Sequence, residues 1–334
     1  MPKTPYDPAM GSKLRPFAII TVALAALIAP NVALSQAPTA AALLGLGGLS
    51  LVLATLSAGL RIGALVSLGL GIASGIAVAG TDHTIVGVVV MASAAVGLGI
   101  SARWHWNKAL VTVPITLAFV VAEDPSQDPL NSAASFGAAM AIYGLLISVL
   151  ASLLRPRDHR QKSNSVRGLS SWSRTWGYVV VLVVTTVASS TIALTLNWGH
   201  TGGWLMMTPF IVIQPYVQDG WRKSLNRVVG TVGGFLIAYL AADSLGSGTA
   251  VTVVGVIFGV LAVTAMIEKW NYAIYALFLT PAIVILESIG RPVQTTADNR
   301  LIATVVGVAL ALVAMALATP IYQREASKDG LQHY

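Results

Sequence analysis

The chain has 334 residues, of which 55% are hydrophobic and only 10% are charged. Together with a mean hydropathy of +0.76, this excludes an ordinary soluble domain, in which about 25% of residues are charged, and predicts a polytopic membrane protein. The absence of cysteine excludes disulfides, thiolate metal sites and cysteine nucleophiles. A net charge of +7 would suit nucleic acid or anionic lipid, and the positions of the basic residues decide between them.

A helix that crosses the bilayer core needs about 20 apolar residues, and the sequence predicts an all-α fold of about twelve such helices. They are expected at 17–34, 39–60, 62–80, 84–102, 109–122, 132–154, 175–196, 202–217, 228–242, 247–267, 271–287 and 301–323. The basic, serine-rich stretch 155–174 is interpreted as a cytoplasmic linker between two six-helix halves, 17–154 and 175–323. Segments 1–16 and 324–334 are expected to be cytoplasmic tails.

The basic residues predict the orientation of these helices. With the N-terminus inside, the external side keeps only Arg291 and Arg300 of the 20 lysines and arginines. This is the positive-inside pattern, and we expect a multi-pass protein of the cell (plasma) membrane with both termini cytoplasmic. The positive charge therefore reports topology and contact with lipids, and nucleic-acid binding is not predicted.

The first apolar segment resembles a secretory signal. Lys13 and Arg15 precede the run FAIITVALAALIA, and the cleavage-like sequence VALSQA follows it. Cleavage would leave eleven helices and spoil the pairing of the two halves. We therefore interpret the segment as an uncleaved first helix.

The two halves repeat each other in sequence. At an offset of 164, residues 106–123 align with residues 270–287. The identical pairs are Trp106/Trp270, Asn107/Asn271, Thr116/Thr280 and Glu123/Glu287. Because six is an even number of spans, this repeat predicts two halves of the same orientation, related by an axis along the membrane normal.

A second repeat lies inside the second half. LMMTPFIVIQ (205–214) matches LFLTPAIVIL (277–286) at an offset of 72, and NRVVGTVGG (226–234) matches NRLIATVVG (299–307) at an offset of 73. The copies are three spans apart, so they must cross the membrane in opposite directions. Each half is thus predicted to be a 3+3 inverted repeat, an architecture typical of transporters whose repeats rock about a central site.

The second half also resembles a known family. The residues concerned are the run from Trp204 through Pro215, the phrase Arg227-Val-Val-Gly230-Thr231 with Gly234, and then Thr280, Arg300 and Gly307. They resemble the fusaric acid resistance-type (FUSC-like) family, an integral membrane bound transporter domain, over about 175–322. That family includes aromatic acid exporters and is related to plant aluminium-activated malate transporters. The resemblance implies export of small, often aromatic, organic anions.

The first half resembles this family less. Arg61-Ile-Gly63 is a shortened counterpart of the arginine–glycine phrase, and Phe136 stands at the repeat position of Arg300.

Arg227 and Arg300 are the first candidate pathway residues. They are expected to open the ninth span from the cytoplasm and the twelfth span from outside. Asn226 and Asn299 are candidate N-caps. A guanidinium beside the free N–H groups of a helix N-terminus suits a carboxylate. The alternative is that both arginines are interfacial anchors whose aliphatic stems snorkel.

Proline-containing segments form the second set of candidates. Matched segments interrupted by proline, at symmetric positions, point to a midplane binding site, with kinked packing helices as the alternative. The candidates are Thr208, Pro209, Gln214, Pro215, Thr280 and Pro281. The aromatic residues near helix ends, Trp204 among them, are mostly expected in the interfacial belt, and Tyr275 is the one predicted to stack on an aromatic substrate.

The glycines of the repeated phrase have a packing interpretation. Their small-residue spacing lets a neighbouring helix approach closely. The predicted packing residues are Gly230, Gly233, Gly234 and Gly307. A phosphate loop would need a following lysine and hydroxyl after a strand, and this sequence has neither.

Catalysis and metal binding find no pattern in the sequence, so neither an enzyme nor a cofactor is predicted. A proton relay usually needs a carboxylate within the membrane. The only candidates are Glu287 and its repeat partner Glu123, which topology alone would also explain.

The sequence therefore predicts a secondary transporter that exports small organic, chiefly aromatic, carboxylates. The alternatives are an anion channel with both halves around one pseudo-dimeric pore and, less favoured, a membrane scaffold. Substrate identity and oligomeric state are left open.

Overall fold

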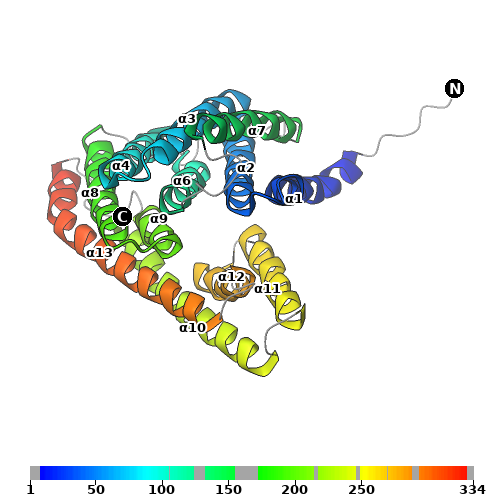
Figure 1. Ribbon diagram of the computed structural model, residues 1–334. Coiled ribbons are helices and arrows are strands. Elements are labelled where there is room, and N and C mark those ends of the chain that lie inside the picture. The colour runs from blue at the N-terminus through cyan, green and yellow to red at the C-terminus, as the bar shows by residue number, and fades with distance from the viewer. Residues whose placement is uncertain are drawn as a thin grey trace. The chain divides into compact units, whose positions relative to one another are not determined.

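The computed structural model describes residues 8–104, 106–123, 132–154, 172–213, 217–245, 249–268, 270–287 and 293–328. Over these ranges the chain forms thirteen α-helices, one 3-10 helix and no strand (Figure 1). In a bilayer a helix satisfies every backbone polar group internally, so long apolar runs without charges become helices. The predicted all-α fold is confirmed.

The chain divides into two compact units, Met1–Trp172 (unit 1) and Ser173–Tyr334 (unit 2). The helices of unit 1 are α1 (Pro8–Ala33), α2 (Pro38–Ala58), α3 (Leu60–Ala79), α4 (Thr84–Ser101), η1 (Ala102–Trp104), α5 (Asn107–Leu110), α6 (Thr112–Ala122) and α7 (Ala133–Leu153). Those that follow are α8 (Trp172–Thr195), α9 (His200–Val212), α10 (Val217–Leu245), α11 (Thr249–Ile267), α12 (Tyr272–Glu287) and α13 (Val293–Lys328). Most of the expected linker, 155–171, lies outside the described residues.

Six helical segments within the described residues are long and apolar enough to cross a membrane. They are Thr39–Ala58, Leu60–Ala79, Thr84–Trp104, Ala133–Leu153, Trp172–Thr195 and Asp298–Leu317. Shorter apolar helices lie at Ala18–Ala33, Thr112–Ala122, Leu225–Ala241, Val253–Ala262 and Tyr272–Ile285. The chain is thus a multi-pass membrane protein, and the count of twelve spans stays a prediction.

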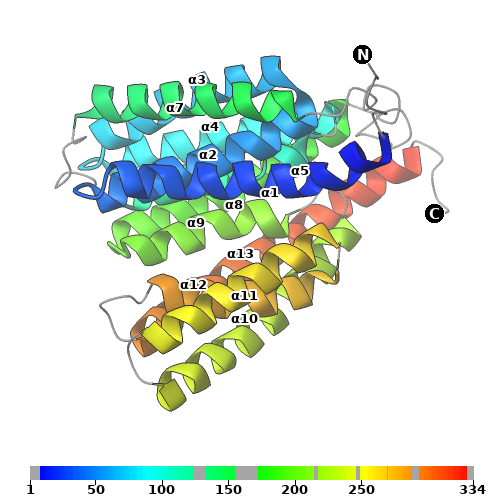
Figure 2. The ribbon, with the colours of Figure 1, turned by 90° about the vertical axis from the view of Figure 1, so that its right-hand side faces the viewer.

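In unit 1, small residues bring α3 and α7 into contact, and the two helices run side by side in Figures 1 and 2. A Cβ on Gly71 would lie 2.7 Å from the carbonyl oxygen of Gly137, and a Cβ on Gly75 would lie 3.6 Å from the Cα of Gly137. The buried Ser67 and Ser148 hydroxyls are hydrogen-bonded across this interface at 3.3 Å. Close approach through glycine is the usual way to pack helices in lipid.

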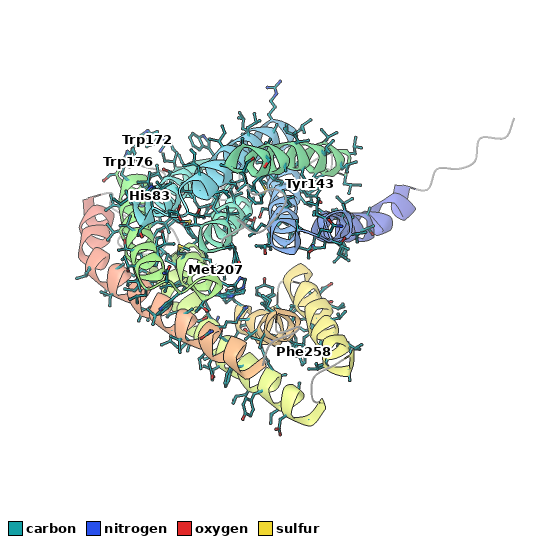
Figure 3. The ribbon with its side chains drawn as sticks, in the orientation of Figure 1. His83, Tyr143, Trp172, Trp176, Met207 and Phe258 are labelled. Atoms are coloured by element: carbon teal, nitrogen blue, oxygen red, sulfur yellow. The ribbon has the colours of Figure 1, made fainter. Side chains whose placement is uncertain are left out.

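Polar contacts also join the other helices of unit 1. The Ser50 hydroxyl of α2 lies 2.9 Å from the Thr116 hydroxyl of α6 and donates to the Thr112 carbonyl at 3.0 Å. The Tyr143 hydroxyl donates to the Ala26 carbonyl at 2.7 Å, so it joins α7 to α1 (Figure 3). These bonds satisfy hydroxyls that would be costly to leave unpaired in an apolar interior.

In unit 2, α10 packs against α12 and α13, α9 packs against α13, and α11 packs against α12. The rings of Phe258 on α11 and Phe278 on α12 lie 6.2 Å apart, and Figure 3 labels Phe258. The helices at these interfaces carry the arginines, the threonine–proline pairs and the glycines that the sequence singles out.

The expected interruption of α9 and α12 at their prolines is wrong. Both helices continue through Pro209 and Pro281. Proline removes one backbone donor, and beside Pro209 the Thr208 hydroxyl donates to the Trp204 carbonyl one turn back, at 2.8 Å. The helix that does break is the fifth of unit 1, where Val111 separates α5 from α6 three residues before Pro114.

Candidate functional site

Arg227 lies inside α10 and is buried, with 5% of its surface exposed. The helix begins ten residues earlier, at Val217, while its apolar segment Leu225–Ala241 begins two residues before Arg227, where the ninth span was predicted to open. Its Nη1 donates to the Tyr272 hydroxyl of α12 at 3.2 Å. Its Nε is also buried, without a hydrogen-bond partner among the described residues. The guanidinium is thus held at one edge and keeps a second donor for a ligand.

Arg300 lies inside α13 and is equally buried, at 5% exposure. The helix begins seven residues earlier, at Val293, while its apolar span Asp298–Leu317 begins two residues before Arg300. Its Cζ lies 3.7 Å from the ring centroid of Trp204 on α9. This is a close cation–π contact, which gains strength away from water.

The two asparagines before the arginines are not N-caps, because both lie within helices. Asn226 donates instead to the side-chain oxygen of Asn271 at 3.1 Å. That oxygen accepts the backbone N–H of Ala273 at 3.0 Å, so Asn271 caps the start of α12. The polar contact between α10 and α12 therefore begins next to Arg227.

Tyr275 connects the surroundings of the two arginines. It lies one turn into α12, and its ring centroid is 5.7 Å from that of Tyr272, the partner of Arg227. Its phenol interacts electrostatically with both Arg227 and Arg300. The Tyr275 phenol therefore lies within electrostatic range of both arginines, and the expected placement of one arginine at each mouth stays a prediction.

The threonine of each Thr-Pro pair is packed against a glycine of the other sequence copy. A Cβ on Gly234 of α10 would lie 2.6 Å from the Thr280 Cβ and 2.9 Å from the Leu277 carbonyl oxygen. A Cβ on Gly307 of α13 would lie 2.7 Å from the Thr208 Cβ. Position 234 corresponds to 307, and 208 to 280, so the contacts are reciprocal. Both threonines are buried, at 0% exposure for Thr208 and 2% for Thr280.

The remaining predicted glycines also face α12. A Cβ on Gly230 would lie 2.5 Å from the Ala273 carbonyl oxygen, which is rigid backbone. A Cβ on Gly233 would meet only the flexible end of Leu277, at 2.7 Å. The need for glycine is therefore stricter at Gly230 and Gly234 than at Gly233.

Other predicted residues lie away from this site or beyond the described part of the chain. Gln214, Pro215 and the Glu287 side chain are outside the described residues. Glu123 is partly exposed just after the end of α6, in unit 1. No group of three metal-ligating side chains occurs in the described part of the chain.

Two aromatic residues of the site were missed as site residues. Trp204 is buried, with 7% of its surface exposed, so its expected place in the interfacial belt is wrong. Trp270, by contrast, is 47% exposed. Tyr272, also an aromatic residue near a helix end, accepts the hydrogen bond from Arg227. Their sequence signal was weak, since aromatic residues near helix ends are common at membrane boundaries. The sequence feature that could have indicated Trp204 is its spacing of four residues from Thr208, which places both residues on one face of a helix.

Comparison with protein families supplies the decisive observation. Residues 187–314 match the family described as fusaric acid resistance protein-like. The match runs from the middle of α8 into α13, so it includes both arginines, both Thr-Pro pairs and all four glycines. The predicted resemblance to this family of membrane transporters is confirmed over these residues. No curated protein and no solved structure matches the chain.

Chemically, the site of the fusaric acid resistance protein-like region suits an anion. Arginine stays protonated at any physiological pH and offers five N–H donors. Within the described residues, Arg227 and Arg300 are the charged side chains that are buried. Burying charge in an apolar interior is costly, so two buried cations create a strong preference for a negatively charged partner.

Proposed function

We propose that the chain is a secondary transporter of the cell membrane that exports small organic, chiefly aromatic, carboxylates. The observation that carries the proposal is the pair of buried guanidiniums, Arg227 and Arg300, at equivalent repeat positions of the packed helices α10 and α13. A fusaric acid resistance protein-like region around this pair supports transport of organic compounds. The proposal assigns no catalytic step and no cofactor.

The proposed mechanism uses twelve spans and the 3+3 inverted repeat. The reciprocal contacts Gly234–Thr280 and Gly307–Thr208 support it, because each joins one repeat copy to the other. A carboxylate enters from the cytoplasm, binds between Arg227 and Arg300 near the buried threonines, and leaves on the external side. The two copies rock about these glycine contacts to change access.

Transport assays with purified protein in lipid vesicles test the proposal. A panel of labelled aromatic and aliphatic acids is compared for the wild type, Arg227→Ala, Arg300→Ala and the control Arg61→Ala, which removes an exposed arginine of unit 1. Because a charge-assisted hydrogen bond contributes about 1.5–3 kcal/mol, we expect each site variant to lower transport at least about tenfold and the control to be unchanged. If the wild type redistributes no acid, the export hypothesis fails.

The same vesicles separate a carrier from the alternative anion channel. A carrier shows saturation, and substrate on the far side stimulates its flux. Single-channel currents with ohmic flux would instead establish the channel. If both arginine variants transport normally, the two arginines have a structural role and do not bind the substrate.

A further inference from the structure

Two hydrogen bonds between α10 and α12 lie side by side at one end of the interface of these helices. The Asn226 side-chain amide donates to the Asn271 side-chain oxygen at 3.1 Å, and Arg227 Nη1 donates to the Tyr272 hydroxyl at 3.2 Å. Asn271 is exposed and Asn226 is half-buried, whereas Arg227 is buried. The asparagine bond therefore lies at the rim of the buried region, directly outside the guanidinium.

Beyond this end, α10 and α12 meet through glycine. The Gly230 position faces the Ala273 carbonyl oxygen, and the Gly234 position faces the Thr280 Cβ. Such close-packed contacts have little directionality, whereas a hydrogen bond requires a narrow range of distance and angle. If the start of α12 tilts away from α10, the hydrogen bonds break first and the glycine contacts act as the pivot.

The other sequence copy cannot make the same asparagine pair. At the repeat offset of 72, Asn271 corresponds to Gly199, and each is the residue directly before its helix, α12 or α9. Asn271 accepts the backbone N–H of Ala273 as well as the Asn226 amide. Gly199 has a φ of 51° and no side chain that could cap α9 or bind Asn299, the counterpart of Asn226. The inverted copies are thus unequal at this one contact.

We propose that the Asn226–Asn271 hydrogen bond is a latch that closes the site on the side where α10 begins, which is expected to be cytoplasmic. This rests on the proposed function, since it assigns the closed side of the same transporter. When the latch opens, the Arg227–Tyr272 bond breaks with it, and a carboxylate replaces the tyrosine as the acceptor. Asn271 still caps α12, because its bond to Ala273 lies within its own helix.

Cysteine labelling measures the opening of the latch without any substrate, because the chain has no cysteine of its own. Thr231 lies one turn beyond Arg227 on α10 and is 4% exposed. In the full chain in oriented vesicles, Thr231→Cys is labelled with a membrane-impermeant thiol reagent from the side where α10 begins. A neutral hydrogen bond changes an equilibrium by about two- to tenfold, so Asn226→Ala should raise the labelling rate by that factor.

A second substitution tests the same bond from α12. Asn271→Ser keeps an N-cap oxygen but is too short to reach Asn226, so it should raise the labelling rate as much as Asn226→Ala does. The double variant should raise the rate no further. Asn299→Ala is the matched control, since it changes the equivalent asparagine of the other copy, and it should leave the labelling rate unchanged.

Cross-linking tests the latch in the opposite direction. A short bifunctional thiol reagent on the variant Asn226→Cys/Asn271→Cys should stop carboxylate transport, a reductant that releases the link should restore it, and each single variant should continue to transport. Transport that continues through the cross-linked protein overturns the latch and leaves the transport function intact. Folded Asn226→Ala and Asn271→Ser variants that label at the wild-type rate, or whose effects add in the double variant, overturn it too. A wild type that moves no carboxylate sinks the proposed function itself, whatever the labelling rates are.

Discussion

Corresponding helices make corresponding contacts within each of the two units, but the two units bury different polar groups. In unit 1, α2 packs on α7, α3 packs on α6 and α7, and α4 packs on α6. At the sequence offset of 164 these helices correspond to α9, α13, α10, α12 and α11, and every corresponding pair is also in contact. The pattern of packing is therefore common to both units, although no charged side chain in the described part of unit 1 is buried.

The difference is concentrated on α3 and α7 of unit 1 and on α10 and α13 of unit 2. Helices α10 and α13 carry Arg227 and Arg300. The corresponding residues of α3 and α7 are Gly63, which is buried, and Phe136, which is fully buried. Unit 1 brings these two helices together through Gly71, Gly75 and Gly137 and adds only neutral hydroxyls. Unit 2 has cations on the same helix pair, so one packing plan supports a neutral interior and a charged one.

The largest effect is expected from making unit 1 resemble unit 2. Phe136→Arg places a guanidinium at a fully buried position where no partner has been built. An uncompensated buried charge costs about 3–5 kcal/mol, so the protein should lose most of its folded yield. Size-exclusion profiles and melting temperature in detergent measure this, with Phe136→Leu as the control. A well-folded variant would show that unit 1 can accommodate a cation as well.

Removing the partner of Arg227 weakens unit 2 without changing charge. Tyr272→Phe deletes the hydroxyl that accepts from Nη1 at 3.2 Å. A hydrogen bond to a charged group is worth about 1.5–3 kcal/mol. We expect a lower melting temperature and weaker transport of every carboxylate, because the guanidinium edge loses its orientation. Tyr239→Phe, at an exposed position of α10, serves as the control, and equal behaviour of the two variants would contradict the assigned bond.

Two adjacent glycines test the contact between α10 and α12. Gly234→Ala forces a methyl against the Thr280 Cβ at 2.6 Å and the Leu277 carbonyl oxygen at 2.9 Å, whereas Gly233→Ala meets only a movable side-chain end. Overpacking costs about 1–3 kcal/mol, so only Gly234→Ala should clearly lower the melting temperature. Equal melting temperatures for the two variants would contradict the described contact.

The smallest effect is expected from the hydroxyls of unit 1. Ser50→Ala removes bonds to the Thr112 carbonyl and the Thr116 hydroxyl. A neutral hydrogen bond contributes about 1 kcal/mol, so the melting temperature should fall slightly. Carboxylate transport per folded molecule should stay unchanged, because unit 1 lacks the buried cations. A selective loss of transport with unchanged stability would place unit 1 in the pathway.

Much of the site could be named from the sequence because membrane composition makes polar residues conspicuous. Arg227, Arg300, Tyr275 and the Thr-Pro pairs stood out against long apolar runs. Hydropathy marks where the apolar span begins, and α10 and α13 extend through polar residues before that point, so the helix starts themselves could not be read from it. For the same reason, the prediction of Asn226 and Asn299 as N-caps is wrong.

By itself, the sequence determined the helical class and singled out the two arginines, because these follow from composition and spacing along one chain, and the two repeats stay predictions from the same spacing. Only the tertiary structure decided that both guanidiniums are buried and that α9 and α12 continue through proline. It also decided that Tyr272 is the partner of Arg227 and that Trp204 is the partner of Arg300. Periodicity tells which residues share a face of a helix, but it does not tell which helix covers that face. The partners of Arg227 and Arg300 come from α12 and α9, which are distant in sequence and are brought close by glycine contacts.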